Sequence, residues 1–248
     1  MRSAPAPGVS WRPLYRAGAL SAVAFVVMVV VPVVLVLVAP LPPTRGRALL
    51  EYIAAHKAVY LTELVSFVGL AVPALVVFLA LAVALKELAP GAAAIGGLFG
   101  VASETIALAL GSSPQSLHGG LVVLSDAYAV AATDADRAAL VAASEALIAA
   151  TNAVSWAGIL TAAGILLLSW AARSGHLGRA LPLLGIATGA IGIVSEALRP
   201  MIGGAYMVYG LLLPAWVGLA GWRLWRLSGS EPTRRRPSAA SRRPRGPS

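Results

Sequence analysis

Cysteine is absent from this chain of 248 residues, and charged residues make up only 12% of it, against about 25% in a typical soluble domain. Without cysteine, disulfide bridges, thiol nucleophiles and thiolate metal sites are excluded. The low charge and a hydrophobic content of 58% leave too little polar surface to coat a soluble core. The sequence therefore indicates a protein whose surrounding solvent is largely lipid.

Lysine is scarce as well, so arginine carries nearly all of the positive charge. Only two of the 19 basic residues are lysines, and the formal net charge is +9. The arginines lie between apolar stretches and in the C-terminal tail, which favours membrane orientation and rules against a nucleic-acid partner. Arginine in place of lysine, with abundant alanine, is typical of a GC-rich bacterial genome. We therefore expect a multi-pass protein of the bacterial inner membrane.

Long apolar runs are what the sequence has in abundance. A helix needs about 20 mostly apolar residues to cross a hydrocarbon core of about 30 Å. Six segments meet or nearly meet this length: 17–39, 64–85, 91–111, 152–172, 180–198 and 201–222. They predict an all-α membrane helix bundle of six transmembrane helices over residues 17–227. A cytoplasmic segment, 1–16, precedes the bundle, and a disordered basic tail, 228–248, follows it.

Local signals add detail to this layout. Pro73 lacks a backbone donor and should kink the second helix. The stretch before that helix, 41–63, has a plausible helical pattern, so the helix is expected to project beyond the lipid. Thr133 or Asp134 is a good N-cap, and no helix breaker follows until Ala172. The fourth helix is therefore expected to be too long for the bilayer.

The distribution of basic residues predicts the orientation. With the N-terminus inside, fourteen basic residues face the cytoplasm, six of them in the tail, and five face outside. This is the asymmetry that the positive-inside rule requires, so both termini are expected in the cytoplasm. Arg2, Arg12 and Arg16 also suit a signal peptide. The first apolar run is too long for one and its end is a poor cleavage site, so we expect it to be retained.

Acidic side chains inside spanning segments are rare and are functional candidates by default. Four glutamates recur directly after a threonine or serine: Glu63, Glu104, Glu145 and Glu196. In the predicted threading all four reach a similar depth in the outer part of the membrane. They are expected to line an outward-facing acidic vestibule that binds a cation, a proton or a basic small molecule. The alternative is that they are ordinary helix-end carboxylates, hydrated or paired, with Glu196 held by Arg199 one turn later.

Basic side chains near the predicted cytoplasmic surface are candidate lipid contacts. Arg223 and Arg226 follow the last apolar run beside two tryptophans, and Arg234, Arg235 and Arg236 lie in the tail. Such residues bind anionic lipid headgroups at about 1 kcal/mol each near the surface. The alternative is a topology anchor with no specific partner.

The sequence carries no motif for catalysis, a metal or a cofactor. The G-x-S-x-G elbow, the H-E-x-x-H pair and the P-loop are all missing. His56 and His118 fall on the predicted outer side and His176 on the inner side, so the three cannot form one metal site. We therefore expect a non-enzymatic protein with a role in binding, sensing or assembly. The alternative is a small transporter, or an ion- or proton-coupled carrier, that uses the membrane-embedded glutamates.

Three short motifs carry a family resemblance. Ala-Ser-Glu-Ala-Leu at Ala143–Leu147 and Leu-Leu-Leu-Ser-Trp at Leu166–Trp170 are followed by a glycine-rich helix, Gly185–Gly192. Together with the layout from Arg16 through the last helix, they resemble a bacterial family of six-helix membrane proteins, the domain of unknown function 4386. The resemblance implies the six-helix fold and its topology, and it supplies no activity or catalytic residue.

Overall fold

The computed structural model describes residues 10–35, 37–110, 117–175 and 177–229. Within these ranges the regular secondary structure is helical and includes no β-strand. Six helical stretches of the described chain are long and apolar enough to cross a membrane: Arg12–Leu35, Lys57–Leu85, Pro90–Leu110, Asp134–Ala171, Ala180–Ala197 and Gly203–Gly229. Each overlaps one of the six predicted segments, which confirms the expected all-α fold with six helices long and apolar enough to span a membrane. The cytoplasmic placement of both termini stays a prediction.

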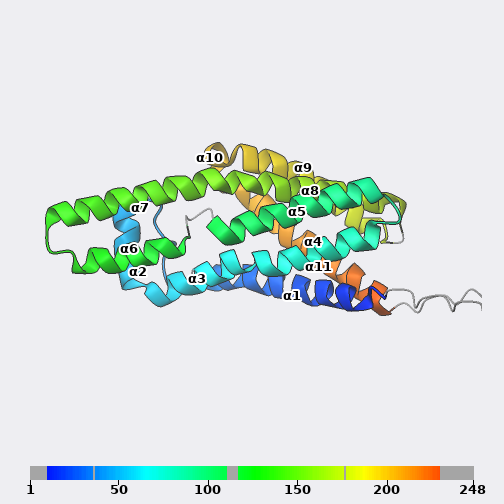
Figure 1. Cartoon of the computed structure of the whole chain (residues 1–248), viewed down its shortest axis with the longest axis horizontal. Coiled ribbons are helices and arrows are strands. Elements are labelled where there is room, and N and C mark those ends of the chain that lie inside the picture. Colours follow the sequence, from blue (N-terminus) through cyan, green and yellow to red (C-terminus); the bar gives the residue numbers. More distant parts are fainter. Residues whose placement is uncertain (1–9, 36, 111–116, 176, 230–248) are drawn as a thin grey trace, which may run out of the picture.

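The spanning helices pack into one bundle along the long axis of the molecule (Figure 1). The bundle consists of six helices: α1 (Arg12–Leu35), α4 (Ala71–Leu85), α5 (Pro90–Leu110), α8 (Gly158–Ala171), α9 (Ala180–Ala197) and α11 (Tyr206–Gly229). Helix α8 packs against both α5 and α9, and α1 packs against both α4 and α11. Contacts between α4 and α5 join the two groups into a single body.

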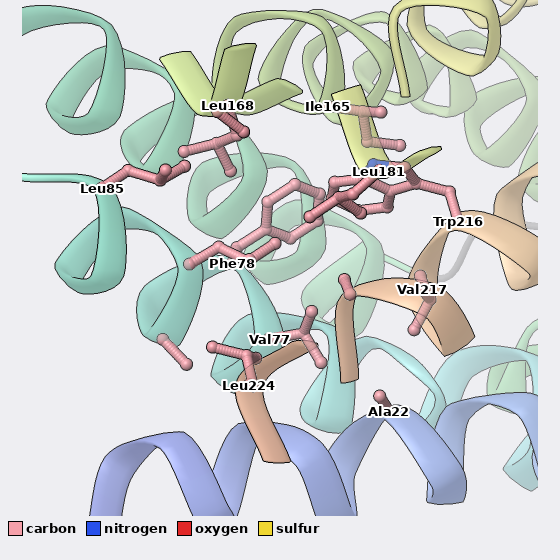
Figure 2. Close-up of a cluster of buried hydrophobic side chains, with 14 of the residues drawn as sticks. Ala22, Val77, Phe78, Leu85, Ile165, Leu168, Leu181, Trp216, Val217 and Leu224 are labelled. Atoms are coloured by element: carbon pink, nitrogen blue, oxygen red, sulfur yellow. The ribbon is translucent and has the colours of Figure 1, made fainter. Parts of the chain in front are cut away.

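Large apolar side chains from α4, α8, α9 and α11 fill the centre of this bundle (Figure 2). The rings of Phe78 and Trp216 lie with their centroids 6.0 Å apart. The Trp216 indole N–H donates a hydrogen bond to Ser169 Oγ at 3.1 Å, which satisfies its buried polar atom. Because lipid tails are as apolar as leucine, van der Waals packing and buried hydrogen bonds stabilise such a core.

The second span is interrupted where the sequence predicts it. It consists of α3 (Lys57–Gly69) and α4, which meet at Leu70. Pro73 lies three residues further on; it cannot donate to the preceding turn, and its ring crowds the carbonyl four residues earlier. The backbone bonds Leu70 N to Ser66 O, 3.2 Å, and Ala74 N to Leu70 O, 3.1 Å, continue on either side. The chain therefore stays helical overall but loses its regularity at Leu70.

Beyond the bundle, three helices form a structure that we call the cap. It comprises α2 (Gly46–Ala55), α6 (Gly119–Val130) and α7 (Asp134–Val154). These helices contact one another at one end of the molecule (Figure 1). A separate apolar cluster holds them together: Leu49, Tyr52, Ile53, Tyr60, Leu117, Leu121 and Ile148. The cap therefore has a small core of its own.

The fourth span is longer than a bilayer requires, as predicted. Helix α7, the 3-10 turn η1 (Ser155–Ala157) and α8 follow one another over 38 residues, about 57 Å of helix against a hydrocarbon core of about 30 Å. Thr133 is its N-cap, because Thr133 Oγ1 accepts a hydrogen bond from the Asp136 amide at 3.1 Å. The surplus length carries α7 out of the bundle and into the cap.

The opposite end of the bundle carries three tryptophan–cation pairs. Lys86 Nζ lies 4.5 Å from the centroid of the Trp11 ring. The Arg173 and Arg226 guanidinium groups lie 4.5 Å and 4.9 Å from the ring centroids of Trp170 and Trp222. Amphipathic rings beside cations are typical of a membrane–water interface. We call this end of the molecule the basic end.

Candidate functional site

The fold brings two of the four candidate glutamates to one place inside the bundle. Glu104 on α5 and Glu196 on α9 are 7% and 4% exposed. Glu104 lines a cavity of about 180 Å³, and Glu196 contacts Arg199 and Tyr206, which line the same cavity. Sequence reasoning selected both carboxylates and Arg199, and the structure adds the cavity that Glu104 and Arg199 line.

Apolar side chains form much of the cavity wall. Phe25 and Val29 come from α1, Phe67 from the end of α3, Leu70 from the break in the second span, and Leu213 from α11. Charged and polar atoms are confined to the part of the wall built by α5, α8, α10 (Arg199–Ile202) and the start of α11. The cavity is therefore amphipathic, with an apolar part and a polar part of its wall.

Glu104 is held by hydroxyl groups and lies outside any ion pair of the described residues. Its Oε1 lies 3.0 Å from Thr161 Oγ1 on α8. Thr161 Oγ1 in turn lies 2.7 Å from Ser103 Oγ, and Ser103 donates to the Ala157 carbonyl at 2.7 Å. Ser103, directly before Glu104 in sequence, therefore bonds across to η1 instead of back along its own helix.

Glu196 has a different set of partners. Its Oε2 lies 3.6 Å from Arg199 Nη1, and its Oε1 accepts a hydrogen bond from the Tyr206 hydroxyl at 2.7 Å. Arg199 also donates to the Tyr206 hydroxyl at 3.1 Å, and its guanidinium lies 4.8 Å from the Tyr206 ring centroid. A Cβ on Gly158 of α8 would lie 2.6 Å from Glu196 Cδ, so only glycine leaves room for this carboxylate. The pairing of Glu196 with Arg199 confirms the alternative foreseen for that residue.

Tyr209 lines the cavity and carries a buried polar atom without a hydrogen-bond partner. The residue is 2% exposed, lines the cavity, and packs edge-on against Tyr206 with ring centroids 5.8 Å apart. Its hydroxyl is buried and has no hydrogen-bond partner. A buried hydroxyl without a partner costs about 1–3 kcal/mol, so a ligand that formed a hydrogen bond with it would recover part of that free energy.

Breaks in two spanning segments and the end of a third border the cavity. The second span breaks at Leu70, the fourth at η1, which ends at Ala157, and the fifth ends just before α10, which begins at Arg199. Leu70, Ala157 and Arg199 all line the cavity. Irregular backbone inside a membrane bundle is tolerated where it lines a polar or hydrated space, and broken helices surround the binding sites of many carriers.

Glu145 has a structural role in the cap, at the start of α2. Its Oε1 accepts a hydrogen bond from the Gly46 amide at 2.7 Å, across 99 residues of sequence. A carboxylate at this position satisfies an amide left free by the helix geometry and complements the positive end of the helix dipole. Gly46 also contacts Ser144, and a Cβ at residue 46 would collide with the Ser144 hydroxyl.

Glu63 lies in the second span next to the cap and away from the cavity wall. It is 2% exposed, and its Oε2 has no hydrogen-bond partner. Burial and, to a smaller extent, the negative charge of Glu63 raise the pKa of Tyr52 on α2, whose hydroxyl donates to the Pro40 carbonyl at 2.8 Å. Neither Glu63 nor Glu145 lines the cavity, so one vestibule shared by all four glutamates does not form there.

Two of the five candidate lipid contacts lie among the residues that the structure describes. Arg223 and Arg226 lie on the last turns of α11, where Arg226 stacks on Trp222. Arg223 approaches the segment before α9: a Cβ on Gly178, whose φ of +74° favours glycine, would lie 2.7 Å from Arg223 Nη2. Arg234, Arg235 and Arg236 lie outside the described residues.

Sequence reasoning missed the hydroxyl groups that complete the site: Thr161, Tyr206 and Tyr209. Thr161 is a single polar residue in an apolar helix, a pattern usually satisfied within the helix itself. The two tyrosines at the start of the last span are typical of an aromatic belt. Only their spacing of three residues, which places both on one helix face, was available as a signal.

Comparison of this chain with protein families, with curated proteins and with solved structures finds no match. The resemblance to the domain of unknown function 4386 therefore stays a prediction.

Proposed function

We propose that this is a non-enzymatic protein of the bacterial inner membrane that binds a small organic cation in the cavity beside Glu104. The single observation that carries the proposal is a buried carboxylate without an ion pair in a cavity that is also lined by Tyr209, whose buried hydroxyl has no hydrogen-bond partner. A protonated amine supplies N–H groups for both oxygen atoms. The apolar part of the amine would pack against the apolar part of the cavity wall.

Charge favours a cation over an anion. Glu196 and Arg199 form a pair whose formal charges cancel. Glu104 then leaves the site with an excess of acid. A cation bound there would neutralise a carboxylate in low-dielectric surroundings, where a buried charge is costly unless it is paired.

Size limits the ligand. An engineered cavity of about 150 Å³ with apolar walls binds benzene, so the volume of about 180 Å³ suits a molecule only slightly larger. Benzylamine has a ring of this size and one ammonium group, and it is a suitable probe. Benzyl alcohol and toluene have nearly the same shape without the charge.

Thermal unfolding of the purified protein in detergent tests the proposal. Benzylamine is expected to raise the melting temperature in proportion to its occupancy, because a ligand that binds only the folded state stabilises it. Benzyl alcohol and toluene are expected to have a smaller effect. Glu104→Gln should weaken benzylamine binding by at least about tenfold, given about 1.5–3 kcal/mol for a charge-assisted bond.

The matched control is Glu87→Gln. Glu87 is an exposed carboxylate at the basic end, outside the cavity wall, so its amide should bind benzylamine as the wild type does. Equal stabilisation by benzylamine and toluene, or equal affinity in the Glu104 variant and the wild type, would refute the proposed function.

A second candidate function is transport of the same kind of ligand. The two helix breaks at the cavity, at Leu70 and at η1, support it, because carriers place broken helices around a site within the membrane. Uptake of labelled amine into vesicles containing the protein, lost in Glu104→Gln and kept in Glu87→Gln, is the expected result for a carrier. Binding without uptake would favour a receptor or sensor.

We further propose that the basic end faces the cytoplasm and contacts anionic lipids through Arg223 and Arg226. The tryptophan–cation pairs at this end support the proposal, because they suit an interface rich in negative charge. A reporter fused after Ser248 should report a cytoplasmic C-terminus. A periplasmic signal would reverse the orientation.

A further inference from the structure

Three contacts between oxygen atoms near Glu104 form one continuous chain of hydrogen bonds. The Ser103 hydroxyl donates to the Ala157 carbonyl at 2.7 Å. Ser103 Oγ lies 2.7 Å from Thr161 Oγ1, and Thr161 Oγ1 lies 3.0 Å from Glu104 Oε1. All three distances are those of hydrogen bonds, so each requires one hydrogen atom between its two heavy atoms.

Counting hydrogen atoms along this chain fixes its direction. Ser103 has one hydroxyl hydrogen, and it points at the Ala157 carbonyl, which can only accept. The contact between Thr161 and Ser103 must then use the single hydrogen of Thr161. No hydrogen is left for the contact between Thr161 and Glu104 unless Glu104 carries it. The chain is complete when it runs from a protonated Glu104 to Thr161, then to Ser103 and to the carbonyl of Ala157.

An ionised Glu104 would leave one contact without a hydrogen. If Thr161 turned its hydrogen toward the carboxylate, the oxygen lone pairs of Thr161 and Ser103 would face each other at 2.7 Å. If Ser103 turned toward Thr161, the lone pairs of Ser103 Oγ and of the Ala157 carbonyl would face each other at 2.7 Å. Either arrangement brings two oxygen atoms to hydrogen-bond distance with no hydrogen between them, which is unfavourable.

The charged and titratable groups around the cavity are compatible with a protonated Glu104. Arg199 lines the cavity, but its charge is paired with Glu196. The Tyr206 hydroxyl bonds to both Arg199 and Glu196, so these three side chains satisfy one another. Tyr209, from α11, contributes a neutral hydroxyl. No described basic side chain pairs with Glu104, so nothing there requires it to be an anion.

We propose that Glu104 holds a proton when the cavity is without ligand and gives it up when a small organic cation binds. The inference rests on the proposed function and deepens it, because it makes cation binding an exchange. One ammonium ion enters, the O–H bond of Glu104 breaks, and one proton leaves for the water. The carboxylate that remains pairs with the ammonium, and Thr161 turns its hydroxyl hydrogen toward it. The net charge of the site is unchanged by the exchange.

This exchange predicts a pH dependence. Releasing one proton on binding makes the affinity for the ammonium ion rise about tenfold for each pH unit, as long as Glu104 is protonated without ligand and the amine stays charged in solution. Binding to a carboxylate that was already ionised would show no such slope. Glu104→Gln should abolish it.

Infrared spectroscopy tests the resting state of Glu104 in the full-length protein without ligand. The spectrum is expected to contain the carbonyl stretch of a neutral carboxylic acid that is missing from Glu104→Gln and present in the control Glu87→Gln. Thr161→Ser keeps the hydroxyl and should keep the frequency of that band, whereas Thr161→Val should shift it. A spectrum without a band assignable to Glu104 would overturn the inference.

Calorimetry with benzylamine tests the exchange. Titrations in two buffers of different ionisation enthalpy should report release of about one proton per molecule bound, and none in Glu104→Gln. Binding without proton release, with the infrared band retained, would overturn the exchange and leave the proposed function standing. Failure of benzylamine to bind the wild type at all would overturn the proposed function and the exchange with it. The two failures are therefore distinguishable.

Discussion

The bond between Glu145 and the start of α2 provides a sharp test of how the cap is attached. Glu145 Oε1 accepts from the Gly46 amide at 2.7 Å, and the carboxylate lies at the positive end of the α2 dipole. Glu145→Gln keeps an acceptor oxygen but loses the charge. Glu145→Ala loses both the acceptor and the charge, so it should be the more harmful change.

The magnitude follows from the chemistry of the contact. A hydrogen bond to a charged group contributes about 1.5–3 kcal/mol, and water reaches this exposed side chain, so a value around the lower end of that range applies. We expect Glu145→Ala to lower the free energy for opening the cap by about 1–2 kcal/mol, which corresponds to a factor of about 5–30 in the open population. Glu145→Gln should lie between the alanine variant and the wild type.

Hydrogen exchange of the protein in lipid nanodiscs measures this opening directly. Amides of α2 and α6 should exchange faster in Glu145→Ala by the factor above, while amides of α5 and α8 should keep their wild-type rates. The contrast arises because the cap has its own apolar cluster and the bundle has another. Unchanged exchange in α2, or equal acceleration in cap and bundle, would refute the structural role of Glu145.

Two further variants test the cavity itself. Gly158→Ala places a Cβ 2.6 Å from Glu196 Cδ, so it should displace that carboxylate from Tyr206 and lower the free energy of unfolding by about 1–3 kcal/mol. The control is Gly91→Ala, where a Cβ meets nothing within 4 Å; a thermal melt in which both variants behave alike would contradict the tight fit at Gly158. Tyr209→Phe removes a hydroxyl without a hydrogen-bond partner, so thermal stability should be kept or slightly increased while benzylamine binding weakens. Unchanged affinity measured by calorimetry would exclude that hydroxyl from the site.

Much of the fold was predictable from sequence because a bilayer imposes constraints that act along the chain. A spanning segment must satisfy its own backbone and remain apolar for about 20 residues, so composition alone locates it. Pro73 marked the interruption of the second span, and Thr133 marked the start of the fourth. The helix of the second span extends back to Lys57, as the helical pattern before residue 64 indicated, and Tyr60 in its first turns packs in the apolar cluster of the cap.

Which acids meet was decided only by tertiary structure. The four glutamates share one local sequence context, yet Glu104 lines the cavity and Glu196 contacts two residues of its wall, while Glu145 bonds to α2. That context is only a serine or threonine before each glutamate. It does not specify which helix face the glutamate lies on or which helix packs against that face. Those depend on how α5, α8 and α9 pack, and on residues such as Gly158 that admit a side chain from another helix.

By itself the sequence determined that the protein is helical, how many apolar helices it offers to a membrane and where proline breaks one of them. These properties follow from a solvent that acts on each segment separately. The tertiary structure alone decided that Thr161, Tyr206 and Tyr209 surround two of the acids. Hydrogen bonds between helices depend on positions in space, and residues more than fifty places apart in the chain supply their two ends.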